Sequence, residues 1–253
     1  MVETAPRIEW GAAEIGGPLH EYREGLLMGL AARFIPRGDA VLDAGCGGGS
    51  LLLKMAAAGY RMSGIEGSDR FVRKVRDRIA REGFGGRCEV RQGDLAALPF
   101  ESASFDALVA AEVLEHVPED GKAVGEFFRV LKKGGVCLVS VPAHPGLWDF
   151  TDVAAGHMRR YERTELIALF ENRGFRMERV LSWGFPSVRF YSRYLYLPYA
   201  RRKAASGVGG VDSLPDGGRY PFLTVLLKTI FRIDSLFGAL PWGIGWLLVA
   251  RKP

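Results

Sequence analysis

A short run from Asp43 to Ser50 combines one acid with several glycines, a composition typical of a ligand-binding turn. The run follows an apolar stretch, and glycine stands at positions 45, 47, 48 and 49. Glycines let the backbone turn tightly and let a ligand lie against the main chain. A dinucleotide fingerprint requires G-x-G-x-x-G, but counting from Gly45 puts Ser50 at its last position. The Asp43 carboxylate would repel a pyrophosphate and attract an ammonium group, so a ligand with an amino-acid end is favoured.

Two further acids, Glu66 and Asp94, stand in comparable positions after apolar segments. Glu66 closes one predicted strand, and Asp94 follows the next one along the chain. In a doubly wound sheet the carboxyl ends of parallel strands form the ligand crevice. Three acids at three successive strand ends therefore predict a single binding site.

The elements that would position these acids alternate between short strands and helices. The predicted strands cover residues 40–43, 62–66, 88–91, 107–111, 136–141, 175–182 and 246–250, and the predicted helices cover 19–34, 50–58, 69–82, 120–131 and 165–173, the last with Thr164 as N-cap. Such alternation predicts β-α-β units in a doubly wound, Rossmann-like α/β sheet of seven strands with helices on both faces. About sixty residues separate the last two strands, which predicts a helical insertion.

Residues 41–52 resemble the first motif of the class I S-adenosylmethionine-dependent methyltransferases. The similarity continues through residues 105–109 and 113–117, which are similar to the branch that includes ubiquinone and menaquinone methyltransferases, and through 131–135. It covers roughly residues 20–183 and the last strand. The resemblance implies S-adenosyl-L-methionine as cofactor and a seven-stranded sheet whose last strand is antiparallel.

The resemblance also implies a role for each acid at the strand ends. Asp43 and the glycine turn would hold the methionine end, Glu66 the ribose hydroxyls, and Asp94 the adenine amino group. His116 would be a packed neighbour of the adenine pocket. The complete predicted cofactor set is Asp43, Gly45, Cys46, Gly47, Gly49, Glu66, Gly67, Ser68, Asp94, Leu95, Ala111, Glu112 and His116.

The loop 142–161, after the fifth strand, is expected to face the methyl group that is transferred. Methyl transfer depends mainly on positioning and exclusion of water, but a hydroxyl or amine acceptor also needs a base, and histidine has a suitable pKa. We predict His157, then His144, as that base. The alternative is that His157 belongs to a helix start fixed by Glu162 or Glu165. The predicted substrate contacts are His20, Tyr22, Trp148, Arg159, Arg160, Tyr161 and Tyr191.

Two other interpretations of the same loop remain open. Its paired arginines would either clamp a carboxylate or phosphate of the substrate or serve as solvated or structural side chains. Asp149, Asp152, His144 and His157 are metal-ligating residue types, as in catechol-type relatives, but their spacings match no compact ligand pattern. No metal site is therefore predicted.

Charge is distributed unevenly along the 253 residues, whose formal net charge is +5. Residues 1–182 carry 24 basic and 26 acidic side chains, a net charge of −2, whereas residues 183–253 carry 10 and 3, a net charge of +7. The first half of the insertion, 185–203, has six aromatic and five basic residues and no acid. Residues 204–221 are glycine-rich and predict a mobile loop, and 222–240 are apolar. The insertion is interpreted as a packed helix pair, a substrate lid or a peripheral membrane contact through 185–240.

Composition and motifs narrow the function further. Apolar residues at 48% and charged residues at 25% exclude a disordered chain, and the uncharged run 235–250 is too short and broken to span a bilayer. Three cysteines and no apparent signal peptide favour a cytoplasmic protein, with peripheral membrane contact as the alternative. One domain is expected, with a cap helix region 1–36, a cofactor-binding core 37–183, an insertion 184–242 and a last strand 243–253.

A nucleic-acid substrate is not expected, because the first 182 residues are net acidic and 110–113 lack an Asn-Pro-Pro-Tyr-like tetrapeptide. Aminopropyl transfer is disfavoured by Asp43, since that acid suits an amino-acid end. We predict an S-adenosylmethionine-dependent methyltransferase for a small-molecule or lipid-like acceptor, releasing S-adenosylhomocysteine. The alternative is a non-catalytic or peripheral-membrane module that retains the fold.

Overall fold

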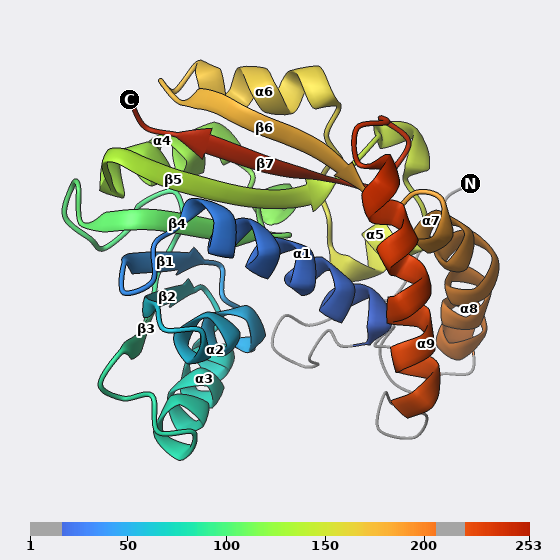
Figure 1. Cartoon of the computed structure of the whole chain (residues 1–253), viewed down its shortest axis with the longest axis horizontal. Coiled ribbons are helices and arrows are strands. Elements are labelled where there is room, and N and C mark those ends of the chain that lie inside the picture. Colours follow the sequence, from blue (N-terminus) through green and yellow to red (C-terminus); the bar gives the residue numbers. More distant parts are fainter. Residues whose placement is uncertain (1–16, 206–220) are drawn as a thin grey trace.

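Seven strands form one sheet in the order β3-β2-β1-β4-β5-β7-β6 in a computed structural model that describes residues 17–205 and 221–253 (Figure 1). The strands are β1 (Ala40–Ala44), β2 (Arg61–Glu66), β3 (Cys88–Gln92), β4 (Phe105–Ala111), β5 (Leu131–Pro142), β6 (Arg176–Trp183) and β7 (Gly245–Arg251). β1 to β5 pair in parallel, and β7 is antiparallel to both β5 and β6. The predicted doubly wound sheet with an antiparallel last strand is confirmed.

Helices cover both faces of this sheet. They are α1 (Pro18–Phe34), α2 (Ser50–Ala57), α3 (Asp69–Arg81), α4 (Asp120–Val130), α5 (Phe150–Ala155), α6 (Arg163–Glu171), α7 (Ser187–Tyr191), α8 (Leu197–Ala205) and α9 (Pro221–Phe231). Successive strand side chains point to opposite faces. Val41 therefore packs in the cluster that contains α1, α2 and α3, whereas Leu42 packs in the one that contains α4 and α6. Burial on both faces explains why the central strands are almost wholly apolar.

The start of α6 differs from the sequence-based expectation. Thr164 is not the N-cap; the helix begins at Arg163 and Glu162 precedes it in an extended conformation. Glu162 and Glu165 form a capping box, in which the Glu162 backbone N–H donates to Glu165 Oε2 at 3.3 Å. This reciprocal pair gives hydrogen-bond acceptors to two backbone N–H groups at the start of the helix, whereas the Thr164 side chain would serve only one.

The insertion between β6 and β7 is helical, as predicted. It contains α7, a π-helical turn (Ser192–Tyr196), α8, α9 and a 3-10 turn (Arg232–Phe237). In Figure 1 the red helix α9 lies beside the blue helix α1, and the two are in contact. Lys228 of α9 pairs with Glu21 of α1 at 2.7 Å. Most of the predicted glycine-rich loop, and the amino terminus on which the signal-peptide prediction rests, lie outside the described residues.

Three aromatic side chains join α1 to the insertion. The ring of Phe231, which is 1% exposed, lies 5.6 Å from Tyr22 and 5.3 Å from Tyr191. Burial is the main reason that the pKa of Tyr22 rises to about 12.

Within residues 17–205 and 221–253, none of the helices has the length and apolar character that a bilayer crossing requires. Cys46, Cys88 and Cys137 are buried free thiols.

We predict that Phe231→Ala lowers the free energy of unfolding by about 3 kcal/mol, because it removes a buried ring and leaves a cavity. Leu236→Ala is the matched control, since that side chain is 80% exposed, and its effect should stay within about 0.5 kcal/mol. Urea denaturation followed by circular dichroism measures both. Equal effects of the two changes would contradict the packing of the insertion on α1.

Candidate active site

The glycine turn after β1 is tightly packed on one side and open on another. The backbone N–H groups of Gly45 and Cys46 both donate to the Ile65 carbonyl, at 2.9 and 3.0 Å. Gly45 has a φ of 80°, and a Cβ there would lie 2.3 Å from Val113 Cγ2, so no larger residue fits. A Cβ on Gly47 would meet no atom of the described residues within 4 Å. The main chain at Gly47 is thus accessible to a ligand.

Glu66, at the end of β2, is held beside this turn by backbone donors. Its Oε2 accepts from the Gly47 N–H and its Oε1 accepts from the Ser68 N–H, both at 2.9 Å. Gly67 lies between the two, and Ser68 also caps α3 through its Oγ. The carboxylate is thereby oriented at the carboxyl edge of the sheet, with lone pairs left for the hydroxyls of a ligand.

Asp43, the acid that precedes the glycine turn, is deeply buried. It is 1% exposed, and its Oδ2 has no hydrogen-bond partner among the described residues. Burial, followed by the charges of Glu24 and Glu66, raises the pKa of Asp43 to about 8. A cationic group beside it would offset all three effects. The residues present therefore fit a ligand that carries an ammonium group, as S-adenosylmethionine does.

Glu24 of α1 is a site residue that the sequence analysis missed. It is 2% exposed and accepts from Ser50 Oγ at 2.9 Å and from Lys54 Nζ at 2.5 Å, and His20 Nε2 lies 3.0 Å away. Burial alone would raise the pKa of Glu24, but His20 and Lys54 outweigh it and lower the pKa to about 2. This network fastens α1 over the start of α2. Nothing in the local sequence pattern identifies it, because the partners are 26 and 30 residues away.

The end of β3 lies next to that of β2. The Gly93 N–H donates to the Glu66 carbonyl at 3.1 Å, so Asp94 follows directly at the same edge. Asp94 is exposed, and its Oδ1 accepts from the Ala96 N–H at 2.9 Å. Leu95 is buried. The three acids predicted to bind the cofactor thus stand at or just after the carboxyl ends of β1, β2 and β3, which are neighbours in the sheet.

A second group of charged residues lies after β4 and β5. Ala111 ends β4, and Glu112 follows with a φ of 51° and pairs with Arg23 of α1 at 3.5 Å. Glu115 is fully buried, and neither of its carboxylate oxygens has a hydrogen-bond partner within residues 17–205 and 221–253. Burial, followed by the charge of Glu112, raises the pKa of Glu115 well above its ordinary range. Burial also lowers the pKa of His116, next in sequence, to about 4.

His157 reaches the same group from the turn after α5. Its Nδ1 lies 2.7 Å from Asp152 Oδ1, and the Arg160 Nε–H donates to that oxygen at 2.8 Å. Burial opposes ionisation of Asp152, but the hydrogen bonds from His157 and Arg160 hold its pKa below the usual range. α5 was not predicted, although the capping box of Asp149 and Asp152 is visible in the sequence.

Other predicted substrate residues have partners within the protein. Arg159 pairs with Asp120 at 2.5 Å, and the Tyr161 hydroxyl donates to Asp120 at 3.0 Å. These contacts fasten the loop to α4. His144 Nδ1 lies 3.4 Å from Glu162 Oε2, and its ring packs on Trp246 rather than on His157. The remaining predicted positions are Trp148, which is 36% exposed, and Tyr22 and Tyr191, which are buried against Phe231.

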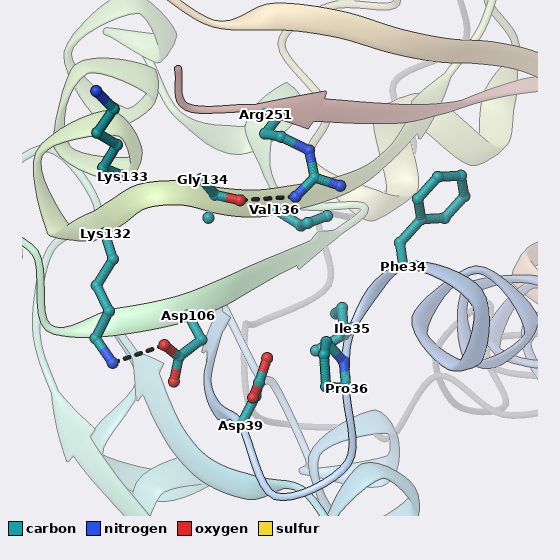
Figure 2. A pocket seen from close by; sticks show the side chains of 11 residues that line it. Phe34, Ile35, Pro36, Asp39, Asp106, Lys132, Lys133, Gly134, Val136 and Arg251 are labelled. Atoms are coloured by element: carbon teal, nitrogen blue, oxygen red, sulfur yellow. Dashed lines mark hydrogen bonds and ion pairs between the residues drawn. The ribbon is translucent and has the colours of Figure 1, made fainter.

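A separate hollow of about 250 Å³ lies at the opposite, amino-terminal edge of the strands (Figure 2). Figure 2 shows Lys132 pointing to Asp106 and Arg251 pointing to the Gly134 carbonyl. These pairs measure 2.6 and 2.7 Å. Because ligands of such sheets bind at the carboxyl ends, and because these charges are already paired, the hollow is not the cofactor crevice.

Comparison with known proteins agrees with this geometry. A family model described as a methyltransferase domain matches residues 42–139. A ubiquinone biosynthesis O-methyltransferase of Xanthomonas axonopodis pv. citri is 30% identical over 219 residues, which are 81% of this chain and 86% of that protein. The chain belongs to the class I S-adenosylmethionine-dependent methyltransferases. It is accordingly a methyltransferase with S-adenosyl-L-methionine as its cofactor.

A second curated relative matches over a shorter part of its length, whereas a solved structure matches over most of its chain. A protein of Mycolicibacterium smegmatis, whose name describes it as an S-adenosylmethionine-dependent methyltransferase, is 37% identical over 148 residues. These residues are 57% of this chain and 54% of that protein. The [4+2]-cyclase SpnF has a solved structure with a TM-score of 0.67 and 24% identity, covering 100% of this chain and 87% of that one. At that identity the likeness shows the fold alone. A fold shared with a cyclase does not define the chemistry.

The raised pKa of Asp43 predicts a pH-dependent stability. The folded protein keeps a proton on Asp43 that the unfolded chain releases above its ordinary pKa of 3.8, so unfolding becomes more favourable as pH rises from about 4 to 8. Asp43→Asn removes this loss. Relative to wild type, the ligand-free variant should gain about 2 kcal/mol in free energy of unfolding between pH 6 and pH 8. Urea titrations at both pH values measure it, and a constant difference would contradict the burial of an ionisable Asp43.

Proposed function

We propose that this enzyme transfers the methyl group of S-adenosylmethionine to a small-molecule or lipid-like acceptor held over the carboxyl ends of β4 and β5. The observation that carries the proposal is the arrangement of two adjacent sites on one sheet edge. Asp43 and Glu66 at the ends of β1 and β2 suit the cofactor. Glu115, His116 and His157 lie close to one another in segments that follow β4 and β5, and β4 is the neighbour of β1 in the sheet.

Each part of the cofactor has a matching group in this proposal. Asp43 takes the ammonium of the methionine end, the open main chain at Gly47 lies against it, and Glu66 accepts from the ribose hydroxyls. Asp94 accepts from the adenine amino group, and the Leu95 N–H serves the ring. When bound, the cofactor supplies the electrophilic methyl group, and the protein supplies position and a water-poor environment.

The insertion supports an apolar acceptor. Phe190 and Tyr194 are 61% and 63% exposed with ring centroids 4.9 Å apart, and Leu236 is 80% exposed; exposed apolar side chains that cluster mark interaction sites. Exposed Arg193 and Arg201 lie on the same helical segment as the two rings. Aromatic and basic residues together suit the boundary between lipid head groups and acyl chains. A lipid-like acceptor would then be taken from a membrane surface that this segment touches.

Calorimetric titration with S-adenosylmethionine tests the cofactor assignment. Wild type should bind one molecule per chain, and Glu66→Ala should weaken binding by about tenfold or more, since hydrogen bonds to a charged group are lost. Glu89→Ala is the control, because Glu89 is an exposed acid on the neighbouring strand β3. Absence of binding by wild type, or equal weakening in both variants, would refute the assignment.

Flotation with vesicles of phosphatidylcholine and anionic phosphatidylglycerol tests the membrane contact. Wild type should float, and the double variant Phe190→Ser/Tyr194→Ser, which alters two rings 4.9 Å apart, should float several-fold less because both apolar anchors are lost. Met158→Ser is the control, since that side chain is 54% exposed but lies outside the insertion. Flotation that is absent in wild type, or unchanged in the double variant, would exclude the contact.

A further inference from the structure

Three potential metal ligands converge next to the proposed acceptor position. Glu115, His116 and His157 each offer one ligand atom, and these atoms lie within 4.8 Å of one another. Glu115 and His116 come from the turn after β4, and His157 follows α5, 41 residues further along. The Met158 N–H donates to the Glu115 carbonyl at 2.9 Å, which holds the two segments together. Only His157 is shared with the metal-ligating residue types of the loop that the sequence brings together, which are Asp149, Asp152, His144 and His157.

Both histidines are oriented through their Nδ1 atoms. His157 Nδ1 lies 2.7 Å from Asp152 Oδ1, and His116 Nδ1 lies 3.3 Å from the Gly156 carbonyl oxygen. Both partners accept hydrogen bonds, so each Nδ1 carries the proton and each Nε2 carries a lone pair. A carboxylate or a backbone carbonyl behind the ring is the usual support of a metal-ligating histidine.

The groups that face one another inside this set are therefore acceptors. His157 Nε2 lies 3.8 Å and His116 Nε2 4.0 Å from Glu115 Oε1, distances that are too long for hydrogen bonds. Four ligands at the 2.0–2.1 Å usual for zinc are about 3.3 Å apart in a tetrahedron. A small inward movement of the three side chains would therefore close them around an ion.

Glu115 is the second, independent indication of a cation. Its side chain is 0% exposed, and both carboxylate oxygens lack a hydrogen-bond partner in the described chain. The nearby cations already have other partners, because Arg23 pairs with Glu112 and Arg160 with Asp152. If both histidines are neutral and all three acids are ionised, the carboxylates of Glu112, Glu115 and Asp152 outnumber the two arginines, and the group has a net charge of −1. A divalent ion would reverse that excess and satisfy the buried carboxylate.

We propose that Glu115, His116 and His157 form a binding site for a divalent transition-metal ion of the zinc type. Two imidazoles and one carboxylate are a common set for such ions, and three protein ligands leave a position open for another oxygen. Glu112 lies three residues before Glu115, and its buried Oε1 also has no hydrogen-bond partner among the residues that the structure describes. His157 then acts as a ligand and not as the base.

The role of the ion in catalysis rests on the proposed function. A hydroxyl of the acceptor binds at the open position and releases its proton to water, because the ion lowers its pKa. The oxygen lone pair forms the new bond to the methyl carbon. The carbon–sulfur bond breaks with its electron pair staying on sulfur, which leaves S-adenosylhomocysteine without the sulfonium charge. The site thus suits an oxygen acceptor.

Titration with Co²⁺ tests the site without any activity measurement. The full chain, free of a polyhistidine tag and treated with a chelator, should bind one Co²⁺, develop visible absorption bands and show a higher melting temperature. Glu115→Gln and His157→Gln should each weaken Co²⁺ binding by at least about tenfold. His144→Gln is the control, because this histidine of the same loop contacts Glu162 and Trp246 instead, and it should bind as wild type does.

The outcomes separate this proposal from the cofactor assignment. Wild type that binds neither Co²⁺ nor Zn²⁺, or that binds them equally after Glu115→Gln, overturns the metal site. Because the melting temperature of each variant is recorded without metal, a variant that does not fold is replaced by His116→Gln. Metal binding without S-adenosylmethionine binding in calorimetry would uphold the metal site and refute the proposed function.

Discussion

Buried carboxyl groups along one edge of the sheet are the constraint on which the rest of the structure depends. Asp43, Glu115 and Asp152 are each no more than 1% exposed, and isolated carboxylates are costly to bury. Asp152 is paired with His157 and Arg160. Asp43 Oδ2 and the Glu115 carboxylate have no hydrogen-bond partner in the part of the chain that the structure describes. A bound cationic group would therefore be stabilised most at these two positions. Asp43 belongs to the proposed cofactor site, and Glu115 belongs to the proposed acceptor site.

The same constraint explains why α1 and the insertion are needed. α1 brings Glu24 to Ser50 and Lys54 at the cofactor turn, and it brings Arg23 to Glu112 after β4. α9 in turn packs on α1 through Phe231. A segment that follows β6 in sequence thereby supports the helix that closes the cofactor edge.

Sequence patterns are sufficient for the sheet and for the cofactor turn because both are local. The strand periodicity, the glycines at 45, 47 and 49, and an acid at each strand end all lie within short windows. Glu24, Asp152 and the pairing of Arg159 with Asp120 depend on segments that only packing brings together. The sequence pattern likewise does not show that Asp120 holds both Arg159 and Tyr161, which are predicted substrate contacts. The sequence shows that Glu115 is next to His116, but it does not show that His157 lies close to both.

A crystal structure with S-adenosylhomocysteine bound tests most directly the claim that this acidic edge holds the cofactor. The amino group of the ligand is expected to lie about 3 Å from Asp43, or to be bridged to it by one water, and both ribose hydroxyls are expected to donate to Glu66. A ligand bound elsewhere, for example in the hollow of Figure 2, with neither acid in contact, would contradict it.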